Sequence, residues 1–335
     1  MAAVSAPPAT ASPATHSPAT FSVVIPCKNE AMHIDAVLDR LLAVMRGLGE
    51  PFEILVVDDG SSDRLLDHVR ARRAASPEVK AVALSRNFGK EVALTAGLDH
   101  AAGAAVILID ADLQHPPEAI PGFVALWRQG YEVVYGVRAT READPWLRRL
   151  ATRLFYRLMS GVAQTAVPPD AGDFRLLDAR AVAALRALPE RVRFMKGLYT
   201  WIGFRQIAVS FEVDRRTGGA SRFSLWRLWN FAIDGITGLS SFPLHVWSYV
   251  GAIIALLAIA YGAEVVFQTV VLGKSVPGYP SLMVAILFLG GVQLLSLGVI
   301  GEYLSRMFLE VKSRPLYLVR ERLGATPQPG PRDDL

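Results

Sequence analysis

Two long, nearly uncharged apolar stretches near the C-terminus most strongly limit what this chain can fold into. They cover residues 246–272 and 282–300. At about 1.5 Å of rise per residue, a helix over either stretch is long enough to cross the hydrocarbon core of a bilayer. The segment GKSVPGYP between them is too short to fold alone. We therefore expect an integral membrane protein whose residues 244–309 form a hairpin of two transmembrane helices, at about 246–272 and 282–304.

The charge distribution predicts how this hairpin is oriented. Hydrophobic residues make up 52% of the chain and charged residues 20%, with a net charge of +4. Much of the positive charge flanks the hairpin, at Arg216, Arg222, Arg227, Arg306, Lys312 and Arg314. By the positive-inside rule, both flanks belong in the cytoplasm. We expect a multi-pass protein of the inner (cytoplasmic) membrane with its soluble domain and both termini cytoplasmic. Because the membrane accounts for the basic residues, no nucleic-acid partner is expected.

The ends of the chain and its single cysteine add further constraints. Residues 1–20 are rich in Pro, Ala and Thr and lack the basic and apolar regions of a signal peptide, so a disordered tail is expected. Residues 310–335 are expected to form a cytoplasmic tail. A lone Cys27 excludes an internal disulfide framework and fits a reducing compartment. Glycines in the second span permit close helix packing, either within the hairpin or between subunits. The sequence therefore leaves undecided whether the protein forms a homo-oligomer.

From Phe21 onward, short apolar runs alternate with segments of helical periodicity. We expect strands at residues 21–26, 52–58, 79–85, 104–110 and 131–136, and helices at residues 33–45, 64–75, 90–101 and 117–127. Continuous apolar strands are typical of a sheet that is covered on both faces. The alternation predicts a mainly parallel, Rossmann-like α/β domain over residues 21–222. In such sheets, ligands bind beyond the carboxyl ends of the strands.

Three of these strand ends carry polar or acidic clusters, namely PCKNE (26–30), DDGSSD (58–63) and DADLQHPPE (110–118). The chain contains no G-x-G-x-x-G turn after the first strand and no P-loop, which disfavours dinucleotide oxidoreductases and P-loop enzymes. An edge that presents carboxylates needs a divalent cation to bridge it to a diphosphate. Asp110 and Asp112, with Gln114, offer the oxygen ligands that suit Mg²⁺ or Mn²⁺.

Two of the clusters also have an ordinary structural explanation. Asp112 before Pro-Pro-Glu is typical of a helix N-cap, and the DDGS run is typical of a turn between strand and helix. The interpretation as a site depends on all three clusters meeting at one edge of one sheet. There Glu30 and Asp59 would accept hydrogen bonds from a base or ribose, while Asp110 and Asp112 hold the metal at the diphosphate.

Seven motifs in order make the pattern specific: VVIPCKNE, VVDDGSSD, LSRNFGKEVALTAGLDHA, ILIDADLQHPPE, AGDFRLLD, RRTGGASRF and GEYLSRMFLEVKSRPLYLV. Together they resemble the family 2 glycosyltransferases that act on polyprenyl phosphates, of the bactoprenol glucosyltransferase and dolichol-phosphate mannose synthase types. The likeness runs from about Phe21 to Val319. It implies a GT-A type fold, a nucleotide-sugar donor, a divalent metal, and inverting transfer of one sugar to a lipid phosphate.

The resemblance also implies roles for individual residues. The positions implied to bind the nucleotide-sugar are Pro26, Glu30, Asp58, Asp59, Lys90 and Asp110. Those implied to surround the metal are Asp110, Asp112 and Gln114. Asp173 matches the position usually credited as catalytic base. An acceptor phosphate, however, has a second pKa of about 6 and is mostly a dianion near neutral pH. Cations that hold it in line should therefore matter more than a base, and Asp173 would instead orient an arginine or stabilise charge at the sugar.

Candidates for binding the acceptor phosphate are Arg138, Arg175, Arg216, Ser221 and Arg222. Glycines within RRTGGASRF would let the backbone approach a phosphate closely. The family usually has lysine where Arg222 stands, and arginine can bind a phosphate through two donors at once. The alternative is that these arginines only contact anionic lipid at the membrane surface.

Two further stretches are predicted to be amphipathic helices at the membrane surface. Residues 145–161 combine an apolar stripe with a stripe of arginines, which is typical of an interfacial helix. Packing of this helix against the soluble domain is the alternative. Residues 223–243 carry two tryptophans and lead directly into the first span. Both helices would bring the strand ends to the depth of a lipid phosphate.

These features favour a hexosyltransferase that makes a polyprenyl-monophosphate sugar, with UDP-glucose as donor and undecaprenyl phosphate as acceptor. GDP-mannose or another UDP-sugar remains an alternative donor. A processive polysaccharide synthase shares the early motifs, but the Q-x-x-R-W signature of that class is absent from the sequence. An inactive membrane scaffold or flippase partner is the alternative of another class, and it would have no need for the acidic residues at the strand ends.

Overall fold

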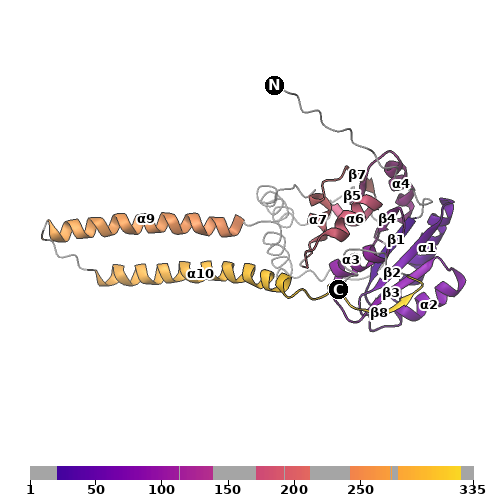
Figure 1. The fold of residues 1–335 in the computed structure, drawn as a ribbon, viewed down its shortest axis with the longest axis horizontal. Helices are drawn as coiled ribbons and strands as arrows, with labels where there is room; N and C mark the ends of the chain where they lie inside the picture. The colour runs from indigo at the N-terminus through magenta and orange to yellow at the C-terminus, as the bar shows by residue number, and fades with distance from the viewer. Residues whose placement is uncertain are drawn as a thin grey trace, which may run out of the picture.

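The continuous apolar runs of the sequence form the centre of a sheet that is covered on both faces. The computed structural model describes residues 21–112, 114–138, 171–191, 193–211, 242–271, 273 and 278–325. Within them, the strands are β1 (Phe21–Cys27), β2 (Phe52–Asp58), β3 (Val79–Leu84), β4 (Ala105–Leu108), β5 (Val133–Arg138), β6 (Ala171–Asp178), β7 (Gln206–Phe211) and β8 (Val319–Leu323). They form one mixed sheet in the order β7-β5-β6-β4-β1-β2-β3-β8. Figure 1 shows this sheet with helices around it.

The middle of this sheet is parallel. Strands β4, β1, β2 and β3 run in the same direction as neighbours. Strand β6 runs antiparallel to both β4 and β5, and β8 runs antiparallel to β3 at the edge. The carboxyl ends of β1, β2 and β4 and the beginning of β6 therefore lie at one edge of the sheet.

Helices cover both faces, and alternate strand residues pack against each layer. One layer contains α1 (Ile34–Gly47), α2 (Leu65–Ala75), the short 3₁₀ turn η1 (Pro117–Ala119) and α4 (Ile120–Arg128). The other contains α3 (Lys90–His100), α6 (Ala179–Ala187) and α7 (Met195–Trp201). In β1, for example, Val23 and Ile25 face the first layer and Val24 faces the second. This explains why the strands are apolar throughout.

The predicted fold class is confirmed in its architecture: the domain is a mainly parallel α/β sheet with helices on both faces. The five expected strands and four expected helices are present with ends close to the predicted residues. Strands β6, β7 and β8 were not among the expected strands. The single cysteine is buried, and its thiol donates to the carbonyl of Ile25 at 3.6 Å, which fits a structural residue.

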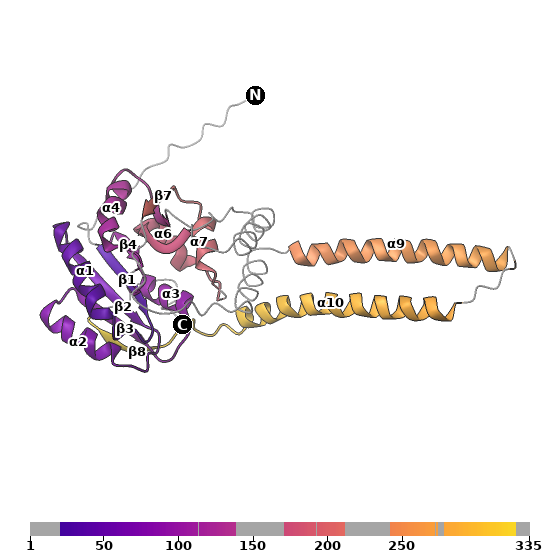
Figure 2. The ribbon, with the colours of Figure 1, turned by 180° about the vertical axis from the view of Figure 1, so that it is seen from behind.

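The C-terminal hairpin consists of α9 (Phe242–Val270) and α10 (Tyr279–Val311), which extend side by side away from the sheet (Figures 1 and 2). Among the described residues, Val284–Val311 is long and apolar enough to cross a membrane, and its apolar window is not buried inside the molecule. The described apolar stretch of α9, Leu256–Val265, is shorter. An apolar surface of this size needs a cover from outside the chain, and the protein is membrane-associated.

Several expected features lie outside the described residues. These are the N-terminal tail (1–20), the amphipathic helix at 145–161 and most of the second amphipathic segment, residues 223–241. The segment expected to be a cytoplasmic tail, 310–335, differs from that simple description because its residues Val319–Leu323 form β8 on the sheet.

Close packing of α3 on the sheet predicts the effect of one small substitution. Gly97 is buried, and a Cβ atom there would overlap Cγ1 of Val24 and lie 3.2 Å from Cγ2 of Val57. We expect Gly97→Ala to lower the free energy of unfolding by about 1–3 kcal/mol, since overpacked cores are destabilised by that amount. Thermal melts of the purified protein in detergent measure the effect.

A matched control is Gly122→Ala in α4, where a new Cβ has nothing within 4 Å. This variant should be neutral or stabilised by about 0.5–1 kcal/mol, because alanine is favoured over glycine in helices. Equal stability of the two variants would contradict the proposed packing of α3.

Candidate functional site

The three polar clusters meet at the carboxyl edge of the parallel strands. Cys27 of β1 lies opposite Asp58 of β2, and Val24 of β1 lies opposite Leu108 of β4. Hydrogen bonds continue past the strand ends, with the amide of Asp59 donating to the carbonyl of Cys27 at 2.9 Å. The residues after β1, β2 and β4 are thus neighbours, as the βαβ pattern predicts.

Lys90, the first residue of α3, joins two of the acidic groups at this edge. Its Nζ lies 2.7 Å from Oδ1 of Asp110 and 2.6 Å from Oδ2 of Asp173. Asp173 reaches this place because β6 runs antiparallel to β4, with Arg175 opposite Leu108. Residues far apart in the sequence therefore form one compact charged cluster, which we call the Lys90 cluster (Lys90, Asp110 and Asp173).

The opposite charges in the Lys90 cluster stabilise the charged forms of Lys90 and Asp173. Burial acts to lower the pKa of Lys90, but the charges of Asp110 and Asp173 outweigh it and raise that pKa well above its ordinary value. Burial acts to raise the pKa of Asp173, but Lys90 and then Lys196 outweigh it and lower that pKa. At neutral pH the lysine is a cation and Asp173 a carboxylate, which makes Asp173 a weak base.

A further carboxyl group, Glu91, lies behind the Lys90 cluster. Its Oε2 accepts a hydrogen bond from the amide of Met195 at 3.1 Å. Burial, reinforced by repulsion from Asp173, raises the pKa of Glu91 to about 7. This group titrates close to neutral pH beside the site. Sequence reasoning missed Glu91; its only signal is its position next to Lys90 in the quoted motif.

Asp59 organises the backbone in front of Lys90. Its two carboxylate oxygens accept hydrogen bonds from the amides of Phe88 at 2.7 Å and Gly89 at 2.9 Å. Gly89 has a φ of 100°, a conformation that favours glycine. Here Asp59 holds the loop that leads into α3. From the sequence, it is expected to accept hydrogen bonds from a base or ribose.

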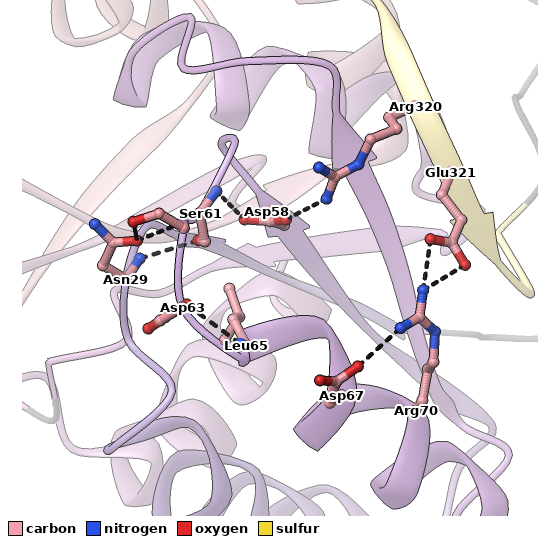
Figure 3. Close-up of polar contacts among 10 residues, drawn as sticks. Asn29, Asp58, Ser61, Asp63, Leu65, Asp67, Arg70, Arg320 and Glu321 are labelled. Atoms are coloured by element: carbon pink, nitrogen blue, oxygen red, sulfur yellow. Dashed lines mark hydrogen bonds and ion pairs between the residues drawn. The ribbon is translucent and has the colours of Figure 1, made fainter.

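Asp58, which precedes Asp59 in the sequence, is buried, and its side chain lies between Ser61 and Arg320 (Figure 3). Its Oδ1 accepts from the amide of Ser61 at 2.8 Å, and its Oδ2 lies 3.5 Å from the guanidinium of Arg320. Arg320 comes from β8, which sequence reasoning did not place near the site. No local pattern could have indicated this contact, because the two residues are far apart in the sequence.

The loops after β1 and β2 are tied together across the same edge. Asn29 donates its amide to Oγ of Ser61 at 3.0 Å and accepts from the amide of Ser62 at 2.8 Å (Figure 3). Glu30 lies next to this junction, and burial, together with repulsion from Asp112, raises its pKa. Pro26 lies within β1, opposite Val57 of β2. These loops therefore form one continuous rim beside the Lys90 cluster.

The expected metal ligands lie directly after β4. Asp110 contacts Lys90, and Oδ1 of Asp112 accepts from the amide of Gln114 at 3.1 Å. In the described part of the chain, no group of three or more His, Cys, Asp or Glu side chains is arranged to hold a metal ion. The protein thus offers two carboxylates, a set that fits Mg²⁺ or Mn²⁺ when substrate phosphates and water complete the coordination.

The candidate acceptor-binding residues are placed very differently. Arg175 is buried, stacks 3.6 Å from the ring of Tyr199, and donates to the carbonyl of Gly172 at 2.6 Å. This packing suits an arginine that orients the beginning of β6, next to Asp173, better than one that faces a ligand. Arg138 is the last residue of β5. Arg216, Ser221 and Arg222 lie outside the described residues.

Two family models match the sequence of this chain. Residues 22–186 match the family "Glycosyl transferase family 2", and residues 242–307 match the "GtrB C-terminal hairpin". The chain is 50% identical over 303 residues to an uncharacterized glycosyltransferase of Synechocystis sp., covering 90% of this chain and 95% of the relative.

Two other relatives have more informative names. The bactoprenol glucosyl transferase of Shigella phage SfX is 42% identical over 301 residues, covering 90% of this chain and 99% of the relative. The prophage bactoprenol glucosyl transferase homolog of Escherichia coli is 40% identical over 299 residues, covering 89% and 98%. Similarity to these relatives extends over both the α/β domain and the hairpin.

The titration of Glu91 predicts a pH dependence of stability. Its pKa is about 7 in the folded protein, against an ordinary 4.5. The folded state then holds the proton more tightly, so the free energy of unfolding falls as pH rises from about 4.5 to about 7. Glu91→Gln removes this effect and should melt higher than wild type at about pH 8, with a smaller difference at about pH 5. The melting temperatures are measured with a thiol-reactive dye, which labels the buried Cys27 only when the protein unfolds.

Glu118→Gln serves as the control, because Arg40 lowers the pKa of Glu118. The contribution of Glu118 changes only at more acidic pH, so this variant should differ from wild type equally at both pH values. The same pattern for Glu91→Gln would contradict the assigned titration.

Proposed function

The chain belongs to glycosyl transferase family 2, and from this premise we propose that it transfers one sugar from a nucleotide-sugar to polyprenyl phosphate. The favoured donor is UDP-glucose, the favoured acceptor is undecaprenyl phosphate, and the transfer inverts the configuration of the sugar. The names of the relatives from Shigella phage SfX and Escherichia coli support this choice of sugar and lipid.

One observation carries the proposal: the Lys90 cluster and an apolar hairpin belong to the same chain. The Lys90 cluster lies at the carboxyl edge of the sheet, where a phosphorylated donor would bind. The hairpin places this domain at a membrane, where a polyprenyl phosphate is held. A water-soluble acceptor would give the chain no use for such an anchor.

The donor would be held by the rim of loops around the Lys90 cluster. Pro26, Glu30, Asp58 and Asp59 line or support this rim, and Lys90 supplies a positive charge next to it. Asp110 and Asp112 would hold Mg²⁺ or Mn²⁺, with Gln114 alongside. The metal, when bound, offsets negative charge on the leaving nucleoside diphosphate.

Asp173 has a role in positioning and electrostatics in this proposal. Its pKa is lowered by Lys90, so it is a poor proton acceptor. The acceptor phosphate needs no strong base, since its second pKa is about 6. The carboxylate of Asp173 holds Lys90 in place. It would also face the sugar, where positive charge develops during transfer.

The acceptor phosphate would be held by basic residues near the membrane. Arg138, Arg216, Ser221 and Arg222 are the proposed ligands, and Arg175 supports the backbone beside Asp173. The protein would be multi-pass, with the catalytic domain and both termini in the cytoplasm, and the amphipathic segments 145–161 and 223–243 would lie at the membrane surface.

A donor panel tests the reaction itself. Membranes that contain the protein are incubated with Mg²⁺ or Mn²⁺, undecaprenyl phosphate and labelled UDP-glucose, other UDP-sugars or GDP-mannose. We expect UDP-glucose to give a labelled product that is extracted into organic solvent and released by mild acid. Absence of labelled lipid with every donor would refute the proposal and favour a scaffold role.

Asp112→Ala should reduce transfer by at least about a hundredfold, because loss of a metal ligand costs more than loss of a residue that supports one. The matched control is Asp39→Ala in α1, where the carboxylate is exposed and pairs with Arg72. The control should retain wild-type activity. Normal transfer by Asp112→Ala would remove Asp112 from the proposed metal site.

Arg216→Ala should mainly impair use of the lipid acceptor. We expect the KM for undecaprenyl phosphate to rise about tenfold or more, which is typical of losing a hydrogen bond to a charged group. The KM for the nucleotide-sugar in the same variant is the internal control and should stay unchanged. An equal rise in both values would contradict acceptor binding by Arg216.

A further inference from the structure

The segment that follows the hairpin returns to the catalytic domain and is tied to it at several points. Oε1 of Glu310, at the end of α10, accepts from the amide of Arg191 at 2.8 Å. The hydroxyl of Tyr317 donates to Asp99 of α3 at 3.0 Å, and the carbonyl of Leu318 accepts from the amide of Ser85 at 2.8 Å. The chain between α10 and β8 is therefore held against α3 and the end of β3.

Strand β8 is held equally firmly at the edge of the sheet. It pairs antiparallel with β3, with Arg322 opposite Val82 and Glu321 opposite Ala83. The carboxylate of Glu321 accepts two hydrogen bonds from Arg70 of α2, at 2.9 and 2.7 Å (Figure 3). These contacts fix the direction in which the neighbouring residue, Arg320, leaves the strand.

Arg320 extends from β8 to the buried end of β2 (Figure 3). The side chain of Asp58 is 1% exposed and that of Arg320 is 49% exposed, and the two lie 3.5 Å apart. Among the described residues, Arg320 is the cation within 4 Å of the Asp58 carboxylate. A carboxylate that is removed from water needs such a partner, because an unpaired buried charge is costly.

Asp58 in turn fixes the tight turn that carries Asp59. Its other oxygen accepts from the amide of Ser61. Gly60 lies between Asp59 and Ser61 and has a φ of 65°. A Cβ atom on Gly60 would lie 2.5 Å from the amide nitrogen of Asn87. The turn is thus pressed against the loop that leads into α3.

Asp59 completes the connection to the Lys90 cluster. Its carboxylate holds the amides of Phe88 and Gly89, directly before Lys90. A contiguous set of contacts therefore runs from Arg320 through Asp58 and the turn at Gly60 to the loop in front of Lys90. Movement of the Asp58 carboxylate would change the position of the whole donor side of the site.

We propose that Arg320 is a positioning residue of the nucleotide-sugar site, so that the strand following the membrane hairpin completes donor binding. The inference rests on the proposed function for the identity of the donor. Arg320 acts through Asp58 and not through the lipid acceptor. Its loss should weaken donor binding and leave use of the acceptor unchanged.

Full-length Arg320→Gln tests this in the transfer assay. We expect the KM for the nucleotide-sugar to rise about fivefold or more, the lower end of a typical coupling between two sites. The kcat and the KM for undecaprenyl phosphate should change little. Arg320→Lys should recover part of the loss, because it keeps the charge at the same place but not the planar group with several donors.

Arg322→Gln is the matched control, since it removes the same side chain from the same strand. Arg322 contacts His100 at 3.3 Å, away from Asp58. Its KM for the donor should equal that of wild type. If Arg322→Gln and Arg320→Gln raise this KM equally, the effect is a general loosening of β8 and the inference is wrong.

A double-variant comparison checks that the effect passes through Asp58. In an Asp58→Asn background, adding Arg320→Gln should raise the donor KM no further. An additional fivefold rise would show that Arg320 acts independently of Asp58 and would overturn the positioning role.

A binding measurement separates this inference from the proposed reaction. The rise in melting temperature caused by uridine diphosphate requires no sugar transfer. It should be present in wild type, Arg322→Gln and Arg320→Lys, and clearly smaller in Arg320→Gln. A normal rise in Arg320→Gln, or no rise in wild type, overturns the inference. Failure of wild type to label lipid, with the expected melting pattern, refutes only the proposed reaction.

Discussion

Two carboxylates, Asp110 and Asp173, meet at the edge of the sheet with Lys90 held between them. Without the lysine, these two partly buried negative charges would repel each other with no cation between them. The rest of the site serves this arrangement. Asp59 fixes the loop before Lys90, and the antiparallel β6 brings Asp173 beside the end of β4. A phosphorylated ligand would meet a region whose positive and negative charges are already ordered, which reduces reorganisation during the reaction.

The parallel half of this design could be predicted from the sequence because its signals are local. Continuous apolar runs and helical periodicity marked the strands β1 to β5 and the helices α1 to α4, and the βαβ alternation placed three polar clusters at one edge. The antiparallel strands could not be predicted in this way. Periodicity does not state pairing direction, and β8, with the sequence VRERL, contains mostly charged residues and looks like a solvated tail. Arg320 near Asp58 and Glu91 near Asp173 depend on such long-range pairings.

The resemblance and the geometry answer different questions about the same residues. Family likeness assigns Asp59 to the nucleotide, and the pattern of basic residues makes Arg175 a candidate for binding the acceptor. In the structure, both are occupied by the protein itself, with Asp59 on two backbone amides and Arg175 stacked on Tyr199. Their contribution is to hold other groups in place, which gives a site its precision. Lys90 and Asp110, in contrast, are partly exposed and keep their charges at the surface of the site.

The position of β8 also bears on how the molecule is made. A ribosome synthesises the chain from its N-terminus, so both helices of the hairpin are made before Val319–Leu323. Until then, β3 is an edge strand with unpaired backbone groups, and Asp58 lacks the arginine that faces it. Within the described residues, the sheet is completed only by β8, which is translated after both helices of the hairpin. The α/β sheet is therefore completed only after the hairpin has been synthesised, so the segment that associates the protein with a membrane is made before the sheet is whole.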